Sequence, residues 1–445
     1  EVGAQAIAAT EHGNVSSWVQ LEKYANKAGI KPIFGIEAYA APPQTRQKFH
    51  QIMIAETGTG LRSLNRLVSR SWAEGFYQWP TMHGDMLRDD PEGLIVTSGC
   101  ADSLLSCTLA GGKSLGDRRD RVSRWDLDEA EKVARRFASL YGDGYYLEVQ
   151  RFPGLDRTRL LNPAIAELSK RTGIPLVATA DVHYPYPHQN KMQTILHAAH
   201  RGGTVDQMEA SWEYDILLTP PTSDAEIYHD LIATGLTPSE SWSAVLSTEE
   251  IAQRCDVTLP KNESLRFPLP DGWSAHELLW EWLREGWQYR HPDNPRMQAL
   301  PDEYVARLHY EMRLIDSKDY NDYFLMVADA VRFAKDLKPR PIPVGPARGS
   351  AAASLVLYIL RVTEVDPLQF PTMVFERFID VSRADLPDID LDFADTRRDE
   401  IRAYLVRRYG ADRVANIGNF VGYKGKNSIA DVSRVYKITK ADEDT

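Results

Sequence analysis

Pro387-Asp388-Ile389-Asp390-Leu391-Asp392-Phe393 is the stretch that decides how this sequence is interpreted, because three carboxylates alternate in it with three apolar side chains. Side chains on a strand repeat every two residues, so the pattern predicts a strand with one acidic face and one apolar face. Two carboxylates on one rigid strand suit two-metal phosphoryl transfer, in which two Mg²⁺ ions roughly 4 Å apart are held over the reacting phosphate. An isolated Asp-x-Asp is more often a solvated face of an edge strand, so the residues upstream decide between the two interpretations.

A Gly-Ser corner precedes this strand by about forty residues, in the run 344–356, Val-Gly-Pro-Ala-Arg-Gly-Ser-Ala-Ala-Ala-Ser-Leu-Val. The run predicts a tight loop that opens a helix, with Ser350 as the N-cap and the alanines as strong helix formers. First-turn N–H groups behind such a corner bind anions, and Arg348 would add positive charge. Each half is weak evidence, since a capped, alanine-rich core helix has the same composition. Together, a phosphate-binding loop and a two-carboxylate strand indicate nucleotidyl transfer.

Four motifs occur in the order and rough spacing of bacterial family C DNA polymerases: Gly345-Pro346-Ala347-Arg348-Gly349-Ser350, Asp366-Pro367-Leu368, Phe375-Glu376-Arg377-Phe378 and Leu386-Pro387-Asp388-Ile389-Asp390. The chain resembles that family. The resemblance implies that Asp388 and Asp390 bind the catalytic Mg²⁺ ions, with Asp392 in support. It also implies a nucleotide site made by Arg348, Gly349, Ser350, Arg383 and Lys426. Ala347 departs from the family, which more often has glycine there.

The resemblance further implies in-line attack by a primer 3′-hydroxyl on the α-phosphate of a deoxynucleoside triphosphate (dNTP). Primer-template DNA and dNTPs are then the substrates. A sliding clamp, clamp-loader components and a proofreading exonuclease are the expected partners of the full-length protein. The family adds a third carboxylate from a later strand, and nothing after Phe393 fits that part. Because the chain opens on Glu1 rather than Met and stops shortly after an expected helix, we expect a fragment that is inactive by itself.

Composition sets limits on the remaining classes. The chain has 445 residues, 43% of them hydrophobic, which is enough for two or three domains with well-formed cores. No run approaches the roughly 18 apolar residues of a membrane span, and no signal peptide is recognisable, so we expect a cytoplasmic protein without membrane contact. Three cysteines do not make a disulfide framework. The net charge of −11 argues weakly against a nucleic-acid-coated protein, but a basic segment follows the acidic strand between Glu400 and Lys440.

The first half contains a second group of candidate residues. Short apolar runs at 6–10, 32–36, 94–97 and 175–179 each lead to residues that bind metals, and helical patterns separate them. This alternation predicts a parallel α/β sheet or barrel, in which functional side chains gather at the carboxyl ends of the strands. A single histidine at such a place is more often a satisfied hydrogen-bonding residue. Four strand ends that carry His, Asp, Glu and Cys together favour a Zn²⁺ or Mn²⁺ site.

This half is similar to the polymerase and histidinol phosphatase (PHP) domain that opens family C polymerases. The matching blocks are Thr10-Glu11-His12-Gly13, Gly35-Ile36-Glu37-Ala38-Tyr39, Ser98-Gly99-Cys100 and Asp181-Val182-His183-Tyr184, and His50 opens another. The resemblance implies that the metal ligands are His12, Glu37, His50, Cys100, Asp181 and His183. The family usually has Asp where Glu11 stands, and its opening His-x-His block would lie before Glu1. In relatives with the full set the domain can act as a metal-dependent 3′–5′ exonuclease, whereas we expect weak or no hydrolysis here.

The expected fold is therefore α/β: a PHP-type (β/α) barrel at 1–262, a polymerase-beta-like nucleotidyltransferase palm (α+β) at 263–415, and the start of a helical thumb at 416–445. Helices are predicted at 247–252, with Ser247 or Thr248 as the cap, and at 275–287, 323–331, 397–409 and 427–434. Two alternatives remain. One is a free-standing PHP phosphoesterase, which leaves Arg348 to Asp390 unexplained. The other is a non-catalytic module that assembles with a polymerase. A cellular replicase, an error-prone paralogue and a phage enzyme all fit the sequence.

Overall fold

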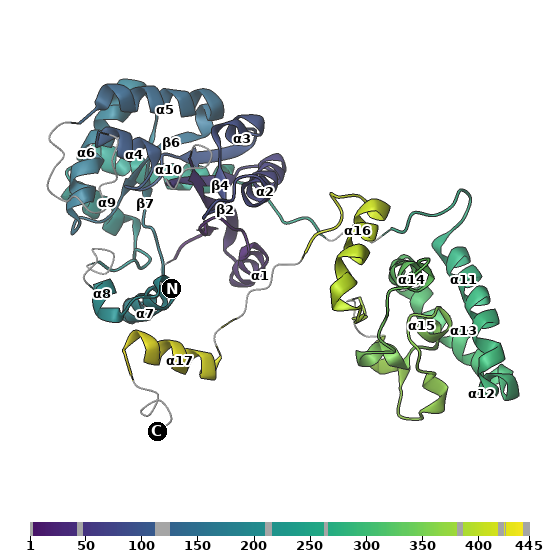
Figure 1. Ribbon diagram of the computed structural model, residues 1–445. Helices are drawn as coiled ribbons and strands as arrows, with labels where there is room; N and C mark the ends of the chain where they lie inside the picture. The colour runs from purple at the N-terminus through teal and green to yellow at the C-terminus, as the bar shows by residue number, and fades with distance from the viewer. Residues whose placement is uncertain are drawn as a thin grey trace. The chain divides into compact units, whose positions relative to one another are not determined.

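The computed structural model describes residues 3–41, 48–111, 125–209, 216–261, 266–380, 386–416, 422 and 424–438 (Figure 1). Two compact units divide the chain, one made of Glu1–Pro260 with Gly422–Thr445 and the other of Lys261–Val421. Among the helices described, none has the length and apolar character needed to cross a membrane.

A curled mixed sheet forms the centre of the first unit, in the order β1-β2-β3-β5-β6-β7, with β4 paired to β2. Its strands are β1 (Ala6–Ala9), β2 (Lys31–Ala40), β3 (Phe49–Ala55), β4 (Thr81–Met82), β5 (Leu94–Thr97), β6 (Tyr145–Gln150) and β7 (Leu176–Thr179). The expectation of a parallel sheet is wrong for β3, which runs antiparallel to both β2 and β5. Only residues 41–48 connect β2 to β3, and a parallel crossover needs a dozen residues or more.

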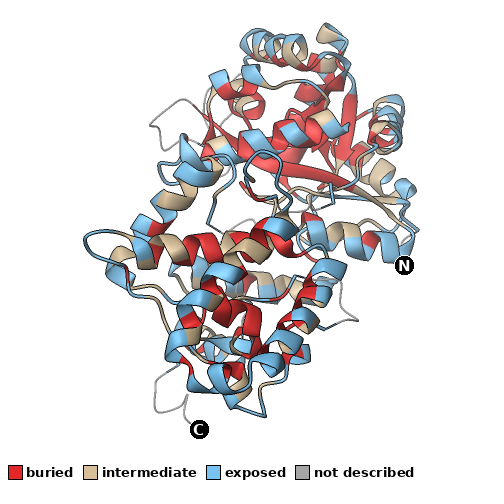
Figure 2. Ribbon diagram, turned by 90° about the vertical axis from the view of Figure 1, so that its right-hand side faces the viewer, coloured by how far each residue is buried: buried red, intermediate tan, exposed pale blue. Residues whose placement is uncertain are grey.

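Helices surround this sheet, and the side chains between them and the strands form the main core, including Phe34, Met53, Leu64 and Leu147. Figure 2 shows the buried residues concentrated along the strands and on the inward faces of the helices. The helices are α1 (Trp18–Ala28), α2 (Gly58–Ala73), α3 (Gly84–Asp89), α4 (Leu104–Leu109), α5 (Leu127–Tyr141), α6 (Asp156–Thr172), α7 (Asn190–Arg201), α8 (Val205–Glu209), α9 (Asp224–Ala233) and α10 (Pro238–Arg254), with 3₁₀ turns η1 (Gly142–Gly144) and η2 (Pro187–Gln189).

The predicted helix at 247–252 is the second half of α10. Ser247 and Thr248 lie inside that helix, so the prediction that one of them caps it is wrong. Thr237 is the cap, and it forms a capping box with Glu240 in which each side chain accepts a hydrogen bond from the other residue's backbone N–H. Pro238 at the first helical position accounts for the earlier start.

The second unit is built mainly of helices: α11 (Ala275–Arg290), α12 (Pro295–Ala299), α13 (Pro301–Ser317), α14 (Asn321–Asp336), α15 (Leu355–Ile359) and α16 (Arg398–Tyr409). Short 3₁₀ turns lie between them: η4 (His291–Asp293), η5 (Gly349–Ala353), η6 (Pro367–Gln369), η7 (Phe375–Arg377) and η8 (Asp395–Arg397). The helices predicted at 275–287, 323–331 and 397–409 are confirmed as α11, α14 and α16. Their apolar faces enclose a separate core around Leu279, Phe324, Leu355 and Phe375.

In the acidic segment of this unit, exposed and packed side chains alternate as predicted, but the segment does not pair with another described strand through a ladder of backbone hydrogen bonds. Asp388, Asp390 and Asp392 are exposed, whereas Ile389 and the apolar residues after it pack against the core. The prediction that this segment forms a strand is wrong. Within the described part of the unit, the segment makes one isolated β-bridge, between Phe393 and Val344. The Pro-rich approach to the Gly-Ser loop is the neighbour of this segment, and a proline has no N–H to donate to a ladder.

A last helix, α17 (Gly425–Val435), corresponds to the helix predicted at 427–434. Its Val435 packs with Ala198 of α7 and Val205 of α8, and the Arg434 side chain donates to the carbonyl of Ala199 at 3.1 Å. This helix therefore belongs to the first unit by its contacts. The assignment of 416–445 to a thumb stays a prediction.

Candidate functional site

Three candidate metal ligands meet at one edge of the sheet. Backbone hydrogen bonds extend the β1–β2 pairing to a bridge between His12 and Glu37, and β3 places His50 opposite Tyr39. Because β3 is antiparallel, its first residues lie at the same edge as the carboxyl end of β2. Glu37 Oε1 lies 2.6 Å from His50 Nδ1, and Glu37 Oε2 lies 3.3 Å from His12 Nδ1. Among the described residues, these three form the one group of ligand-type side chains whose ligand atoms all lie within 4.8 Å of one another.

Electrostatics favour an ionised carboxylate at the centre of this group. Burial opposes ionisation of Glu37, which is 9% exposed, but the hydrogen bond from His50 and the histidine charges outweigh it and hold its pKa below the ordinary value. Burial also opposes the charged form of His50, yet the same hydrogen bond raises the pKa of His50 overall. For His12 burial prevails, and its pKa is lowered. The arrangement is an anionic carboxylate flanked by two imidazoles.

The other three candidate ligands lie around this group. The Cys100 Sγ is 3.4 Å from His50 Nδ1, and burial together with the charges of Glu37, Asp102 and Asp181 raises the pKa of its thiol. His183 Nδ1 lies 2.8 Å from the Asp181 carbonyl oxygen, which only accepts hydrogen bonds. That nitrogen therefore carries the proton, and the Nε2 lone pair of His183 is the one that can bind a metal. The charges of Asp181 and His183 act on His12, so both lie in its neighbourhood, although outside the group of three.

The donor set fits a transition metal. Imidazole nitrogens with a carboxylate and a thiol suit Zn²⁺, and a set without the thiol suits Mn²⁺ equally well. The site opens on one side, because the side chains of His12, Asp181 and His183 are 47%, 34% and 31% exposed, whereas those of Glu37 and His50 are 11% and 16% exposed. A metal held here could be reached by a ligand from solvent.

Glu148 is a further titratable residue beside this site that the sequence analysis missed. It lies in β6 and is 4% exposed, and its two carboxyl oxygens accept hydrogen bonds from Thr97 at 2.6 Å and Thr179 at 2.8 Å. Burial raises the pKa of Glu148 to about 7, and the charges of Asp181 and Glu37 add to that effect. A charged residue inside the apolar run Tyr-Tyr-Leu-Glu-Val of 145–149 was the signal that could have revealed it.

In the second unit, the Gly-Ser loop lies directly against the acidic segment. The N–H of Gly345 donates to the Asp392 carbonyl at 2.8 Å, which joins the two stretches. Gly349 has φ +64°, and a Cβ placed on it would lie 3.0 Å from Asp390 Oδ2. Any other residue at position 349 would thus have a strained backbone conformation, and its side chain would be crowded by the Asp390 carboxylate. The absence of a side chain leaves space between the loop and the Asp390 carboxylate.

Arg348 is engaged with the acidic segment. Its Nη1 lies 2.9 Å from Asp392 Oδ1, and its Nε lies 3.8 Å from Asp390 Oδ2. The side chains of all three residues are between 43% and 60% exposed, and ion pairs this exposed contribute little to stability. The guanidinium can therefore exchange a carboxylate for a phosphate at small cost.

The helix after the loop begins later than expected, so the prediction that Ser350 is its N-cap is wrong. Residues 349–353 form the 3₁₀ turn η5, and Ser354 caps α15 by accepting from the N–H of Leu357. Glu311, which is 0% exposed, accepts the N–H groups of Leu355 and Val356 at 2.9 and 3.0 Å. A carboxylate of the chain itself already occupies this helix terminus. Phosphate binding here would have to use Gly349, Ser350 and Arg348.

Two further predicted nucleotide contacts stay predictions. Arg383 lies outside the described residues. Lys426 is exposed in the first turn of α17, which packs in the first unit.

These observations describe a two-part α/β protein with a candidate metal site and a candidate nucleotide site. Residues 1–152 match the PHP domain family, and residues 277–445 match the bacterial DNA polymerase III alpha NTPase domain family. Curated relatives named DNA polymerase III subunit alpha include those of Treponema pallidum, 34% identical over 98% of this chain, and Thermus aquaticus, 32% identical over 98% of this chain. That of Helicobacter pylori strain J99 is 30% identical over 100% of this chain.

The chain belongs to the family of bacterial DNA polymerase III alpha subunits, and its residues 1–152 match the PHP domain. It spans only part of these relatives, 36% of the Treponema protein, 37% of the Helicobacter protein and 39% of the Thermus protein. Both domain families are metal-dependent in general.

Proposed function

We propose that this chain is the PHP and palm portion of a replicative DNA polymerase that transfers a nucleotide from a dNTP to a primer 3′-hydroxyl. The observation that carries the proposal is the contact between the Gly-Ser loop and the acidic segment, with Gly349 against the Asp390 carboxylate. Primer-template DNA and dNTPs are the substrates, and the cytoplasm is the compartment. A sliding clamp, clamp-loader components and a proofreading exonuclease would bind the full-length protein.

Each group at this site has a distinct role in the proposal. Asp388 and Asp390 would hold Mg²⁺. The bound metal would lower the pKa of the primer hydroxyl and neutralise charge on the phosphates. Gly349 leaves room for a triphosphate beside the carboxylates, and the Ser350 hydroxyl can donate to it. Arg348 would leave Asp392 and pair with phosphate oxygens, for which its planar donor geometry is well suited. Positioning and electrostatics supply most of the rate enhancement in such reactions.

The test is a calorimetric titration of dATP with Mg²⁺ into the chain, because binding needs only groups that the chain carries. We expect Asp388→Asn, Asp390→Asn and Arg348→Ala each to weaken binding by roughly tenfold or more, which is about 1.4 kcal/mol. The matched control is Asp395→Asn, an exposed carboxylate in η8 just after the acidic segment, which should bind as the unsubstituted chain does. Unchanged affinity in both Asp388→Asn and Asp390→Asn would remove the proposal.

The same titration decides the two remaining contacts. Lys426→Glu and Arg383→Ala should each weaken dATP binding if these residues lie near the nucleotide. Unchanged affinity would remove that residue from the site. Templated primer extension by this chain should be undetectable, and extension at a rate comparable with its full-length relatives would contradict our view that it is inactive by itself.

A second function, hydrolysis of phosphodiesters at the PHP domain, is favoured by the group of His12, Glu37 and His50. These residues, with Cys100, Asp181 and His183, would hold Zn²⁺ or Mn²⁺, which supplies a polarised water at neutral pH. We propose that this activity is weak, because among the described residues only three ligand-type side chains, those of His12, Glu37 and His50, bring their ligand atoms within 4.8 Å of one another. Rapid Mn²⁺-dependent release of 3′ nucleotides from DNA by the chain, lost in His12→Ala, would contradict that expectation.

A further inference from the structure

Beside the candidate metal centre, aromatic side chains are exposed to solvent in the last turn of α2 and on the turn that follows it. Trp72, Phe76 and Tyr77 are 51%, 54% and 53% exposed, and Trp79 is half-buried. The rings of Trp72 and Phe76 stack at 5.4 Å with an interplanar angle of 16°. We call Trp72, Phe76, Tyr77 and Trp79 the aromatic platform. Large rings left exposed side by side commonly mark a binding surface.

The aromatic platform is continuous with the metal centre. Tyr39 stacks on His12 at 5.7 Å and contacts the Trp79 ring at 5.8 Å. The Trp72 Nε1–H donates to the carbonyl of Gly13, directly after His12, at 2.8 Å. A bridge between Phe76 and Pro80 closes the turn that carries the platform. A ligand on the platform is therefore next to the open side of the metal centre.

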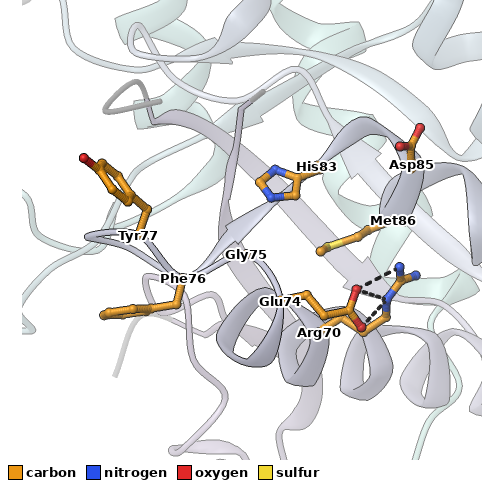
Figure 3. A pocket seen from close by; sticks show the side chains of 8 residues that line it. All are labelled: Arg70, Glu74, Gly75, Phe76, Tyr77, His83, Asp85 and Met86. Atoms are coloured by element: carbon orange, nitrogen blue, oxygen red, sulfur yellow. Dashed lines mark hydrogen bonds and ion pairs between the residues drawn. The ribbon is translucent and has the colours of Figure 1, made fainter. Parts of the chain in front are cut away.

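A pocket of about 510 Å³ lies between the end of α2, this turn and α3. Figure 3 shows Phe76 and Tyr77 on one side of it, with Met86 and the pair of Arg70 and Glu74 on the other. Aromatic and thioether walls with a polar rim suit a flat, partly polar ring such as a nucleobase.

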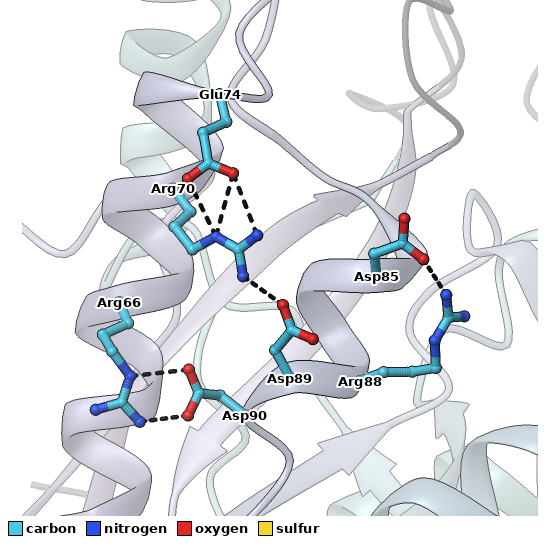
Figure 4. Close-up of polar contacts among 7 residues, drawn as sticks. All are labelled: Arg66, Arg70, Glu74, Asp85, Arg88, Asp89 and Asp90. Carbon is cyan, nitrogen blue, oxygen red and sulfur yellow. Dashed lines mark hydrogen bonds and ion pairs between the residues drawn. The ribbon is translucent and has the colours of Figure 1, made fainter.

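The charges nearby favour stacking over recognition of a duplex backbone. Arg66 pairs with Asp90, Arg70 with Glu74 and Asp89, and Arg88 with Asp85, so four carboxylates face three guanidinium groups and this surface has no excess of positive charge (Figure 4). Lys48 supplies a cation at the rings, with its Nζ 4.0 Å from the Trp79 centroid and 5.2 Å from the Tyr39 centroid. Within the described part of this surface, one ammonium lies among several exposed rings, as on surfaces that bind single strands through their bases, whereas duplex binding depends on many phosphate contacts.

We propose that the aromatic platform binds single-stranded DNA by stacking of its bases, and that it holds the strand beside the metal centre of the PHP domain. The inference rests on the proposed function in one respect, that DNA is the ligand of this chain. It adds a second DNA site, separate from the loop and acidic segment that would bind the dNTP.

The test measures the fluorescence anisotropy of a labelled twelve-nucleotide single strand with the chain, in EDTA and without dNTP. Replacing the rings in the double variant Phe76→Ala/Tyr77→Ala should weaken binding by at least about tenfold, because each stacked base contributes substantially. The conservative double variant Phe76→Tyr/Tyr77→Phe should bind within about twofold of the unsubstituted chain. The matched control is Tyr24→Ala, which removes a 62% exposed ring from α1 and should leave binding unchanged.

A second probe separates stacking from charge. An abasic strand of the same length keeps its phosphates, so it should bind weakly and equally to the unsubstituted chain and to Phe76→Ala/Tyr77→Ala. Normal binding of the intact strand by the alanine variant would overturn the inference, as would an equal loss for the abasic strand. Because the assay omits Mg²⁺ and dNTP, its outcome is separate from that of the dATP titration, and either proposal can fail while the other stands.

Discussion

Glu148 shows how one buried residue can link the PHP domain to pH. Its carboxyl lies between the hydroxyls of Thr97 and Thr179, and burial raises its pKa to about 7. Since the folded-state pKa lies above the unfolded value, the folded protein binds the extra proton. The stabilising contribution is fully present below the unfolded pKa and is lost as pH rises through about 7.

We therefore predict that Glu148→Gln becomes progressively more stable than the unsubstituted chain as pH increases. Between pH 5 and pH 8.5 the difference in free energy of unfolding should grow by about 2 kcal/mol in favour of the variant. Urea unfolding with a chelator present measures it. Glu92→Gln, at an exposed carboxylate in the turn before β5, is the control and should show no such trend. Parallel pH profiles for Glu148→Gln and the unsubstituted chain would mean that Glu148 is ionised in the fold throughout this range.

Single residues were predictable where their role depends on local sequence. The carboxylates of the acidic segment face solvent as their alternation indicates. Ser350 was mistaken for a helix cap because the residue that fixes the helix start, Glu311, lies about forty positions earlier in the chain. No local sequence pattern predicts that contact. The contacts of Thr97 and Thr179 with Glu148 were unpredictable for the same reason.

At the scale of elements, α15 depends on a carboxylate from another helix. Glu311 of α13 accepts from the N–H groups of Leu355 and Val356 and from the Ser354 hydroxyl, and it pairs with Arg307 at 2.7 Å. Burial raises the pKa of Glu311, while the backbone N–H groups and Arg307 favour the ionised form. Removing a buried carboxylate that satisfies several donors leaves all of them unpaired.

We predict that Glu311→Ala lowers the free energy of unfolding of the second unit by about 3 kcal/mol, in line with other broken buried ion pairs. The control is Glu303→Ala on the same helix. Glu303 pairs with Arg296 at a side-chain exposure of 44%, and the loss should stay below about 1 kcal/mol. Urea unfolding followed by circular dichroism gives both values, and equal losses would contradict the capping role of Glu311.

Strand order was less predictable than strand position. The apolar runs correspond to β1, β2, β5 and β7, but the direction of β3 depends on the short connection after β2 and was missed. That direction brings His50 to Glu37. The acidic segment was expected to be a strand, and it is extended with one bridge because its neighbour is the Pro-rich stretch 341–346.

At the scale of the whole molecule, the two units have separate apolar cores, one around Phe34 and Leu147 and the other around Phe324 and Phe375. The order of motifs along the chain made the family recognisable from sequence. The packing of α17 against α7 could not be predicted, because it joins residues more than two hundred positions apart through a few small apolar side chains.

Metal binding should stabilise one unit and leave the other unchanged. With Zn²⁺ at about 100 times its Kd and no dNTP, we predict that the first unit gains about 2.7 kcal/mol in free energy of unfolding. Differential scanning calorimetry with and without EDTA should then show one transition that moves and one that does not. His12→Ala should abolish the shift, since its half-exposed ring is one of the proposed ligands and has little role in the core. A single transition that moves as a whole would contradict the independence of the units.

The measurement that tests the central claim most directly is cleavage of the chain by Fe²⁺ in place of Mg²⁺, with ascorbate and peroxide, in the presence and absence of dATP. Bound Fe²⁺ generates radicals that cut the backbone near the metal. We predict dATP-dependent cuts near residues 345–350 and 386–392, which disappear in Asp388→Asn/Asp390→Asn, and separate cuts near His12, Glu37 and His50 that do not need dATP. Cuts confined to the PHP domain, with none in the second unit when dATP is present, would contradict the assignment of a nucleotide and metal site to the loop and the acidic segment.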